Sequence, residues 1–207
     1  MSRLICSTCE RPLKVCLCGF ITPIDNTIEL GILQHPSEVS QVKGTAKIAQ
    51  LSFTQCTTWI GEDIDSLPEL QSWLQDDKTV FLLYPGIENQ TEVFESFSMI
   101  QIQSGFKFEN IKLLVLDGTW RKTHRMMMLN SALRGLNRIV LEPMRPSNYQ
   151  IRKQKSTASL STIEAIYETY VQLESDSKRY QPLITAFESM QQQQLAFRRL
   201  LPTNSNE

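Results

Sequence analysis

The chain has 207 residues, a hydrophobic fraction of 41% and a formal net charge of -1, which suits one globular domain with an ordinary core and at most a small appendage. This composition argues against a DNA-coating protein and against an acidic disordered chain. No apolar run approaches the ~20 residues that span a bilayer, and the N-terminus, Met-Ser-Arg-Leu-Ile-Cys, lacks the apolar region of a signal peptide. We therefore expect a soluble cytoplasmic protein.

Positive charge is unevenly distributed along the sequence. Between Arg121 and Lys155 the only acidic residue is Glu142, so the remainder of the chain is acidic overall. Local charge matters more than the total when the partner is a polyanion, which makes this basic tract a candidate surface for nucleic acid. The nine basic residues of the tract are Arg121, Lys122, Arg125, Arg134, Arg138, Arg145, Arg152, Lys153 and Lys155.

Four of the five cysteines fall within the first eighteen residues, and in a reducing cytoplasm this clustering favours a metal over disulfides. Tetrahedral zinc with four thiolates needs two close pairs joined by a turn, which Arg11-Pro12-Leu13-Lys14 can supply. An oxidised pair and an iron–sulfur cluster are the alternatives. Because four protein ligands close the site, we expect structural zinc, and Cys56 is expected to be an ordinary core or surface residue. The expected ligands are Cys6, Cys9, Cys16 and Cys18.

The first third of the chain predicts strands alternating with a helix. A strand over Thr27–Gln34 ends at His35-Pro36, where the proline disfavours helix, so His35 lies in a loop. A lone histidine in a loop is usually a surface or structural residue. A short helix over Val42–Leu51 and another strand over Cys56–Ile60 are expected to follow.

Thr79–Tyr84 carries the strongest buried-strand pattern of the chain. It ends in Pro85-Gly86, a turn that lets a ligand approach the backbone closely. A helix over Glu92–Gln103 is expected before a second buried strand, Leu113–Leu116, which predicts a βαβ unit with parallel strands. The sequence holds no G-x-G-x-x-G and no G-x-x-x-x-G-K-[ST], so neither a Rossmann dinucleotide site nor a P-loop is supported.

The second buried strand stops at Asp117-Gly118, a turn-forming pair that places a carboxylate at the strand's carboxyl end. Ligands of open α/β sheets bind just outside this end of the strands, so Asp117 is a candidate functional residue. A structural interpretation is also open: Asp117 caps the helix predicted over Thr119–Leu129, and Trp120 fills the core.

Shorter patterns predict the remaining elements. A strand over Arg138–Leu141 precedes a two-proline loop. Ser161-Thr162-Ile163-Glu164 has the form of a capping box that begins a helix, and the cap alone is enough to explain Ser161 and Glu164. After a linker over Ser175–Arg179, a last helix is expected from Pro182. Leu201–Glu207 should fray.

Taken together and in order, these motifs resemble the DTW-domain family, named for an Asp-x-Thr-Trp motif that reads here Asp117-Gly118-Thr119-Trp120. The resemblance spans roughly Cys6 to Tyr170, and the ordered set is highly specific. Besides the cysteines it includes His35-Pro36-Ser37-Glu38, Leu83-Tyr84-Pro85-Gly86, Ser147-Asn148-Tyr149-Gln150-Ile151-Arg152 and Ser161-Thr162-Ile163-Glu164-Ala165.

The resemblance implies a tRNA-uridine aminocarboxypropyltransferase with a SPOUT-like α/β core, a mostly parallel sheet flanked by helices. Such enzymes move the 3-amino-3-carboxypropyl group of S-adenosylmethionine to N3 of a uridine, in bacterial members in the variable loop of tRNA, and release 5'-methylthioadenosine. We expect a zinc-binding element over residues 1–24, the transferase domain over 25–201 and a flexible tail over 202–207. The expected partner is tRNA, with no membrane and no obligatory protein partner.

The chemistry suggests roles for the matching residues. Asp117 is the expected base for the uridine N3 proton, and Trp120 is expected to stack on the adenine or wall in the methionine chain. Tyr149 is expected to stack on the flipped uridine. The expected cofactor contacts are Leu83, Tyr84, Pro85, Gly86, Leu116, Gly118, Thr119 and Trp120. The expected RNA contacts are Lys47, Arg121, Arg145, Tyr149, Arg152 and Lys153.

One segment departs from the family pattern. Gly44-Thr45-Ala46-Lys47 stands where the family usually shows Asn-Thr-Gly-Arg, so positive charge survives but the asparagine and the second glycine do not. We expect altered contacts by this loop, with a consequence for the RNA that is accepted.

Two rival functions fit parts of the same sequence. An S-adenosylmethionine-dependent RNA methyltransferase would use the same scaffold with the methyl group facing the target. A non-catalytic zinc-ribbon RNA-binding module would have no affinity for the cofactor. The loop from Asp117 to Trp120 argues against the second rival, because a pure binder does not need it.

Overall fold

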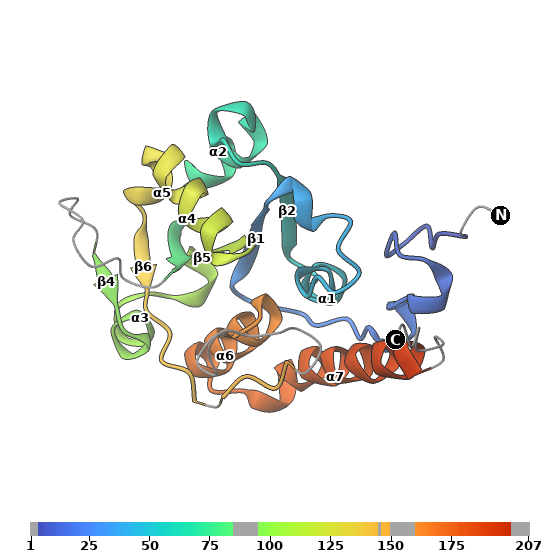
Figure 1. Cartoon of the computed structure of the whole chain (residues 1–207). Helices are drawn as coiled ribbons and strands as arrows, with labels where there is room; N and C mark the ends of the chain where they lie inside the picture. Colours follow the sequence, from blue (N-terminus) through green and yellow to red (C-terminus); the bar gives the residue numbers. More distant parts are fainter. Residues whose placement is uncertain (1–3, 85–94, 145, 150–159, 200–207) are drawn as a thin grey trace.

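A computed structural model of the chain describes residues 4–84, 95–144, 146–149 and 160–199 (Figure 1). Within these ranges, six strands form a single sheet in the order β2-β1-β5-β3-β6-β4, and every neighbouring pair is parallel. The predicted α/β class is confirmed, and the sheet is parallel throughout. The strands are β1 (Glu29–Gln34), β2 (Cys56–Ile60), β3 (Thr79–Leu83), β4 (Ser96–Phe97), β5 (Ile111–Asp117) and β6 (Asn137–Ile139).

Helices cover both faces of the sheet (Figure 1). Alternate residues of β5 divide between two apolar clusters, Leu113 and Val115 in one, Leu114 and Leu116 in the other. A strand buried on both faces is expected to contain a continuous apolar run, and Leu113–Leu116 form one within β5. The first cluster includes residues of α1 (Ala46–Ser52), α3 (Met99–Gly105), α6 (Thr162–Glu174) and α7 (Ser177–Arg199); the second includes residues of α2 (Pro68–Leu74), α4 (Trp120–Leu129) and α5 (Ser131–Arg134).

The N-terminal cysteine-containing element has no separate apolar core among the described residues. It contains two short 3₁₀ turns, Leu13–Val15 and Cys18–Phe20. Cys9 and Leu17 are buried in the cluster that also holds residues of α1 and α7. The element therefore shares a hydrophobic core with the sheet domain, and any change in the element reaches α1 and α7 directly.

Three predicted elements are wrong in their limits. The helix predicted over Val42–Leu51 begins only at Ala46, and the residues before it form a loop. The helix predicted over Glu92–Gln103 begins only at Met99, because Ser98 and Gln101 form a capping box at its N-terminus. The two residues before Ser98 form β4, which pairs with β6. The predicted linker over Ser175–Arg179 contains the start of α7. Ser175, with φ at 56°, ends α6, and the Asp176 side chain accepts a hydrogen bond from the Arg179 amide in the first turn of α7.

The path of the chain marks one place on the sheet where a ligand is expected. From β1 the chain continues to β2 at the sheet's edge, whereas from β5 it continues to β6 on the other side. The loops that follow these adjacent strands therefore diverge, and in doubly wound sheets the crevice between such loops is where ligands bind. Among the helices described here, no segment combines the length and apolarity needed to cross a membrane.

Candidate active site

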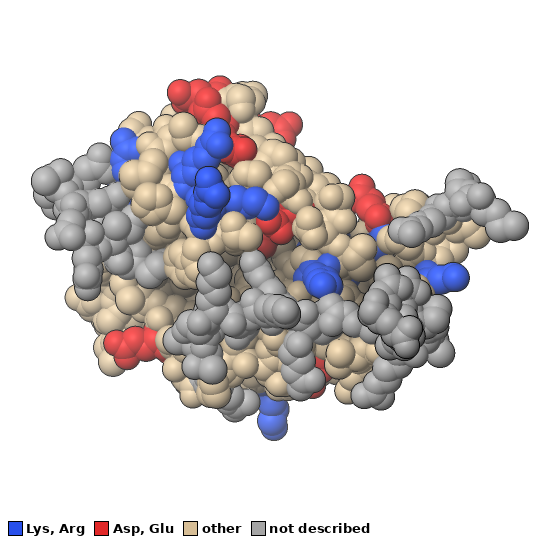
Figure 2. Space-filling view, in the orientation of Figure 1, with Lys and Arg blue, Asp and Glu red and all other residues tan. Residues whose placement is uncertain are grey.

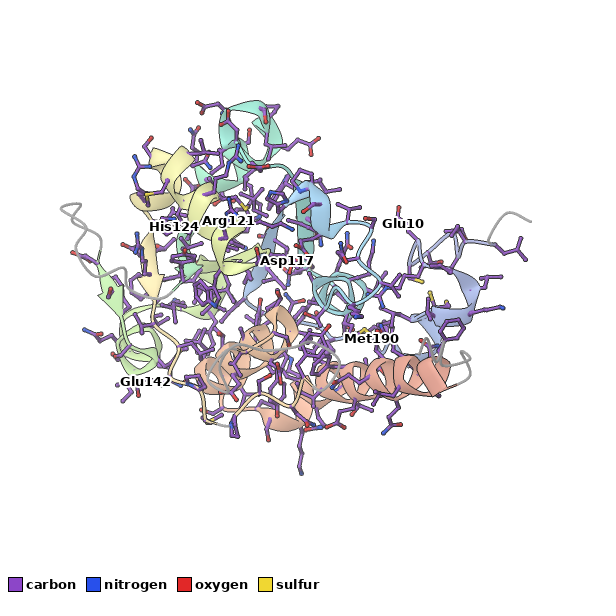
Figure 3. The ribbon with its side chains drawn as sticks, viewed as in Figure 1. Glu10, Asp117, Arg121, His124, Glu142 and Met190 are labelled. Carbon is purple, nitrogen blue, oxygen red and sulfur yellow. The ribbon has the colours of Figure 1, made fainter. Side chains whose placement is uncertain are left out.

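Asp117 is the last residue of β5 and is held from three directions. Its Oδ2 accepts a hydrogen bond from Gln34 Nε2 at 2.8 Å, and its Oδ1 accepts one from Thr162 Oγ1 at 2.6 Å. Gln34 is its register partner on β1, and the Asp117 carbonyl accepts the amide of His35 at 3.0 Å. Asp117 is only 5% exposed and lies in the middle of the molecule (Figure 3). Its orientation is therefore fixed by β1 and α6 as well as by its own strand.

The structural interpretation of the Asp117–Trp120 stretch is wrong on both counts. The N-cap of α4 is Thr119, while the Asp117 carboxylate is hydrogen-bonded to β1 and α6. Trp120 is 57% exposed and so does not fill the core. A buried, oriented carboxylate followed by an exposed indole is an arrangement that could serve a ligand, because neither feature improves the packing of the sheet.

Trp120 and Tyr84 meet where β5 and β3 end. Their ring centroids are 5.9 Å apart with planes at 69°, an edge-to-face contact. Tyr84 itself is buried, and burial raises the pKa of its phenol. At Gly118 the chain passes close to α4, since a Cβ there would lie 3.2 Å from the Cβ of Lys122. The loop after β5 thus offers backbone and an aromatic face next to the carboxylate.

The remaining predicted cofactor contacts have different surroundings. Leu116 is buried in one of the two apolar clusters, and Leu83 is partly buried against the other. Their backbone, not their side chains, is what a ligand at the strand ends would meet. Thr119 is half-buried at the start of α4. Pro85 and Gly86 lie outside the described residues.

Thr162, a residue that sequence reasoning did not single out, reaches Asp117 from the N-terminus of α6. The predicted capping box is confirmed, with Ser161 and Glu164 bonded reciprocally. Glu164 does more than cap: its carboxylate also accepts from Ser147 Oγ at 2.8 Å and from the Asn148 amide at 2.7 Å. The cap therefore fixes both the turn that carries Thr162 and a neighbouring loop.

Ion pairs tie the loop after β1 to α4. Lys122 Nζ lies 2.6 Å from Glu38 Oε1. His35 Nε2 and Arg125 Nε lie 3.0 Å and 3.1 Å from the two carboxylate oxygens of Glu62. The histidine's other nitrogen, Nδ1, accepts the amide of Ser37 in the next turn. His35 therefore connects elements, in agreement with the structural role expected from sequence.

The basic tract divides between structural and surface residues. Arg138 is fully buried, and Arg134 donates to the carbonyl oxygens of Met127 and Met128 at the end of α4. Lys122 and Arg125 take part in the ion pairs above. Arg121 is exposed on α4 (Figure 3), where Lys and Arg side chains gather beside acidic ones (Figure 2). The sequence overstated how much of this charge faces solvent.

The structure places two predicted RNA contacts in other roles. Tyr149 is 6% exposed, its ring packs edge-to-face on Phe187 at 5.2 Å, and its hydroxyl donates to the Lys43 carbonyl. In this arrangement the ring is not accessible to a base, so stacking of the flipped uridine on Tyr149 would require the ring to move. Lys47 Nζ lies 2.8 Å from Glu10 of the N-terminal element. Arg145, Arg152 and Lys153 lie outside the described residues.

The four clustered cysteines form a set that could hold a metal ion. Their sulfur atoms all lie within 4.8 Å of one another, with Cys6–Cys18 at 3.7 Å and Cys9–Cys16 at 3.6 Å. Tetrahedral zinc with Zn–S bonds of ~2.3 Å places its sulfur atoms ~3.8 Å apart, so the site fits zinc. Hydrogen bonds from the amides of Cys9 and Thr8 lower the pKa of Cys6 to about 6, whereas burial and the neighbouring thiols raise the pKa of Cys18, so Cys6 is the thiol of this pair that loses its proton first.

Comparisons with known proteins agree with these motifs. A family model described as the DTW domain matches residues 3–195. The chain is 33% identical over 168 residues to tRNA-uridine aminocarboxypropyltransferase 2 of Macaca fascicularis, covering 77% of this chain and 53% of that protein. It is 27% identical over 197 residues to the Drosophila melanogaster protein of the same name, covering 92% and 74%. The chain spans about half the length of the mammalian relatives. No solved structure matches it significantly.

Proposed function

The chain belongs to the DTW-domain family, and on that premise we propose that it transfers the 3-amino-3-carboxypropyl group of S-adenosylmethionine to N3 of a uridine in the variable loop of tRNA. Relatives named tRNA-uridine aminocarboxypropyltransferase support the reaction class. The observation that carries the proposal is the buried Asp117 carboxylate, oriented by Gln34 and Thr162 beside the exposed Trp120.

The proposed step requires a base and a well-oriented electrophile. S-adenosylmethionine supplies an electrophilic Cγ and a neutral thioether leaving group. Asp117 takes the N3 proton, the N3 electron pair forms the bond to Cγ, and the Cγ–S pair stays on sulfur as 5'-methylthioadenosine. Because uridine N3 is a poor nucleophile until deprotonated, the carboxylate is expected to contribute ~10²–10⁴ in rate.

The loops after β3 and β5 are the proposed cofactor site. Trp120 offers an aromatic face for the adenine or for the methionine chain, while Gly118 and Thr119 offer backbone groups next to Asp117. Their task is to present Cγ rather than the methyl group to the uridine, which is a matter of orientation. The four cysteines would hold a structural zinc ion away from these groups, and the protein would act in the cytoplasm.

We propose that the tRNA binds the exposed face of α4, together with the predicted contacts Arg145, Arg152 and Lys153. Arg121→Ala is expected to weaken tRNA binding several-fold and to reduce the slope of log K against log salt by ~1, as loss of one phosphate contact requires. Binding titrations over a range of salt concentrations check this. Lys178→Ala, which removes an exposed charge from α7, is the matched control; equal effects of the two variants would contradict the assignment.

The product of the reaction tests the function itself. We expect the protein, incubated with S-adenosylmethionine and unmodified tRNA, to accumulate 5'-methylthioadenosine and a tRNA nucleoside carrying the transferred group, both identified by mass spectrometry. S-adenosylhomocysteine together with a methylated nucleoside would instead establish the methyltransferase. If neither 5'-methylthioadenosine nor S-adenosylhomocysteine accumulates while tRNA is still bound, the RNA-binding module remains as the function and the proposal is overturned.

A further inference from the structure

Arg11, in the N-terminal element, is buried against the loop that departs from the family pattern. It is 6% exposed, and its Nη2 donates to the Gly44 carbonyl at 2.6 Å. Its Nη1 lies 3.3 Å from the sulfur of Met190 on α7; Figure 3 labels Met190 there. A buried guanidinium is costly unless it is well bonded, so these contacts are what fix its position.

The loop over residues 42–45 is held by contacts from four directions. Gln194 Nε2 donates to the Val42 carbonyl at 3.0 Å, and the Tyr149 hydroxyl donates to the Lys43 carbonyl. Arg11 holds the next carbonyl, that of Gly44, from the N-terminal element. Thr45 Oγ1 accepts the amide of Ile163 from α6 at 3.3 Å. The loop is thus the place where the N-terminal element, α7 and α6 meet.

The loop's conformation suits the sequence of this chain. A Cβ at Gly44 would lie 3.0 Å from the carbonyl oxygen of Gln41. The asparagine that the family usually has at this position would therefore force the loop to shift. In this conformation the Gly44 carbonyl points to Arg11.

The loop contacts α6 at Ile163, next to Thr162, which is the hydrogen-bond partner of Asp117. Ile163, whose amide bonds to Thr45, directly follows Thr162, whose hydroxyl bonds to Asp117 at 2.6 Å. Amides in the first turn of a helix have no partner inside the helix, so Ile163 depends on Thr45 for its hydrogen bond. A shift of the loop would therefore move Ile163 and the adjacent Thr162, whose hydroxyl orients the Asp117 carboxylate.

We propose that Arg11 is a positioning residue for Asp117, acting through Gly44, Thr45 and the first turn of α6, so that the docked N-terminal element sets the geometry of the carboxylate. The catalytic part of this inference rests on the proposed transfer reaction. The structural part stands independently, because it concerns the hydrogen bond between Ile163 and Thr45. Misplacement of a reacting group by ~1 Å is enough to slow a reaction ~100-fold.

Arg11→Met tests the proposal, since methionine keeps an unbranched apolar stem but has no donor for Gly44. The Ile163 amide is expected to exchange with solvent at least ~10-fold faster, while the β5 amides exchange as in the unchanged protein. Thr45→Val, which removes the acceptor, should give the same result. For transfer, both variants are expected to lower kcat on the order of 10-fold, with KM for S-adenosylmethionine unchanged within a factor of about two.

Glu10→Gln is the matched control. It removes the ion pair with Lys47, which joins the same two elements at the surface, and an exposed pair of this kind contributes little. Unchanged Ile163 exchange in Arg11→Met or in Thr45→Val, or exchange in Glu10→Gln as fast as in Arg11→Met, overturns the proposal. Should Arg11→Met not fold, Arg11→Lys, which keeps the charge but not the planar fork of donors, takes its place, and unchanged Ile163 exchange in that variant overturns the proposal. Should the unchanged protein transfer nothing, the proposed function fails, and the exchange rates still decide whether Arg11 holds α6.

Discussion

Asp117→Asn is expected to lower kcat for transfer by ~10²–10⁴-fold while leaving the affinity for S-adenosylmethionine unchanged. The substitution is isosteric, so Oδ1 can still accept from Thr162. The new amide faces Gln34, whose own amide group can turn to present its oxygen. The variant therefore keeps the packing around a residue that is 5% exposed and removes its negative charge together with its ability to take a proton. Single-turnover transfer and calorimetric titration of the cofactor measure the two quantities separately.

Asp65→Asn controls for the change in net charge, since Asp65 is an exposed carboxylate in a 3₁₀ turn after β2. It is expected to leave transfer and cofactor affinity as they are. Full transfer activity in Asp117→Asn would show that another group, or water, takes the N3 proton. A fall in cofactor affinity equal to the fall in rate would instead make Asp117 a binding residue.

The elements that carry the site could be predicted because each one is encoded locally. β5 is buried along its whole length, and its middle, Leu113–Leu116, is the unbroken apolar run that such burial predicts. Its end at Asp117-Gly118 and the capping box at Ser161 are also local signals, written in neighbouring residues. Parallel pairing of β3 with β5 then follows from the connection between them. These local signals and the parallel pairing are enough to predict a candidate site at the carboxyl edge of the sheet.

The contacts that orient Asp117 are not encoded locally. Gln34 is 83 residues away along the chain and Thr162 is 45. Nothing near Gln34 distinguishes it from any polar residue at a strand end, and only the register of β1 on β5 brings it opposite Asp117. Thr162 lies within the capping-box sequence, but the capping box accounts only for its neighbours Ser161 and Glu164 and assigns no role to Thr162. Side chains at the ends of separate elements meet through the tertiary fold alone.

The errors have the same origin. A run of basic residues predicts a charged surface, yet Arg138 has its side chain in the core because its position on β6 faces inward. Tyr149 stands in a loop whose sequence suggests exposure, and Phe187 of α7, nearly forty residues further on, covers its ring. Burial of a polar or aromatic side chain in a loop depends on what packs over it, and local sequence does not contain that information.

The four-cysteine cluster gives the second large expected effect. Cys9→Ser is expected to reduce bound zinc from one ion per chain to a small fraction of that, because a closed tetrahedral site loses a buried thiolate ligand. Structural zinc contributes ~10–16 kcal/mol to the folding of small zinc modules, more than an element of this size can gain from its own core. Metal analysis and amide exchange across residues 4–20 measure the loss.

The consequences should reach beyond the element, because Cys9 and Leu17 belong to the core shared with α1 and α7. A loss of even ~3 kcal/mol would lower Tm by ~6–12 °C in a chain of this size.

Cys56→Ala is the control. Cys56 lies on β2, outside the cluster, so this variant should keep the zinc. Full zinc binding by Cys9→Ser would contradict the four-thiolate site, and visible absorption of the anaerobically purified protein would favour the iron–sulfur alternative. Release of Arg11 from Gly44 is expected to accompany zinc loss, so the Ile163 amide should exchange faster in Cys9→Ser as well.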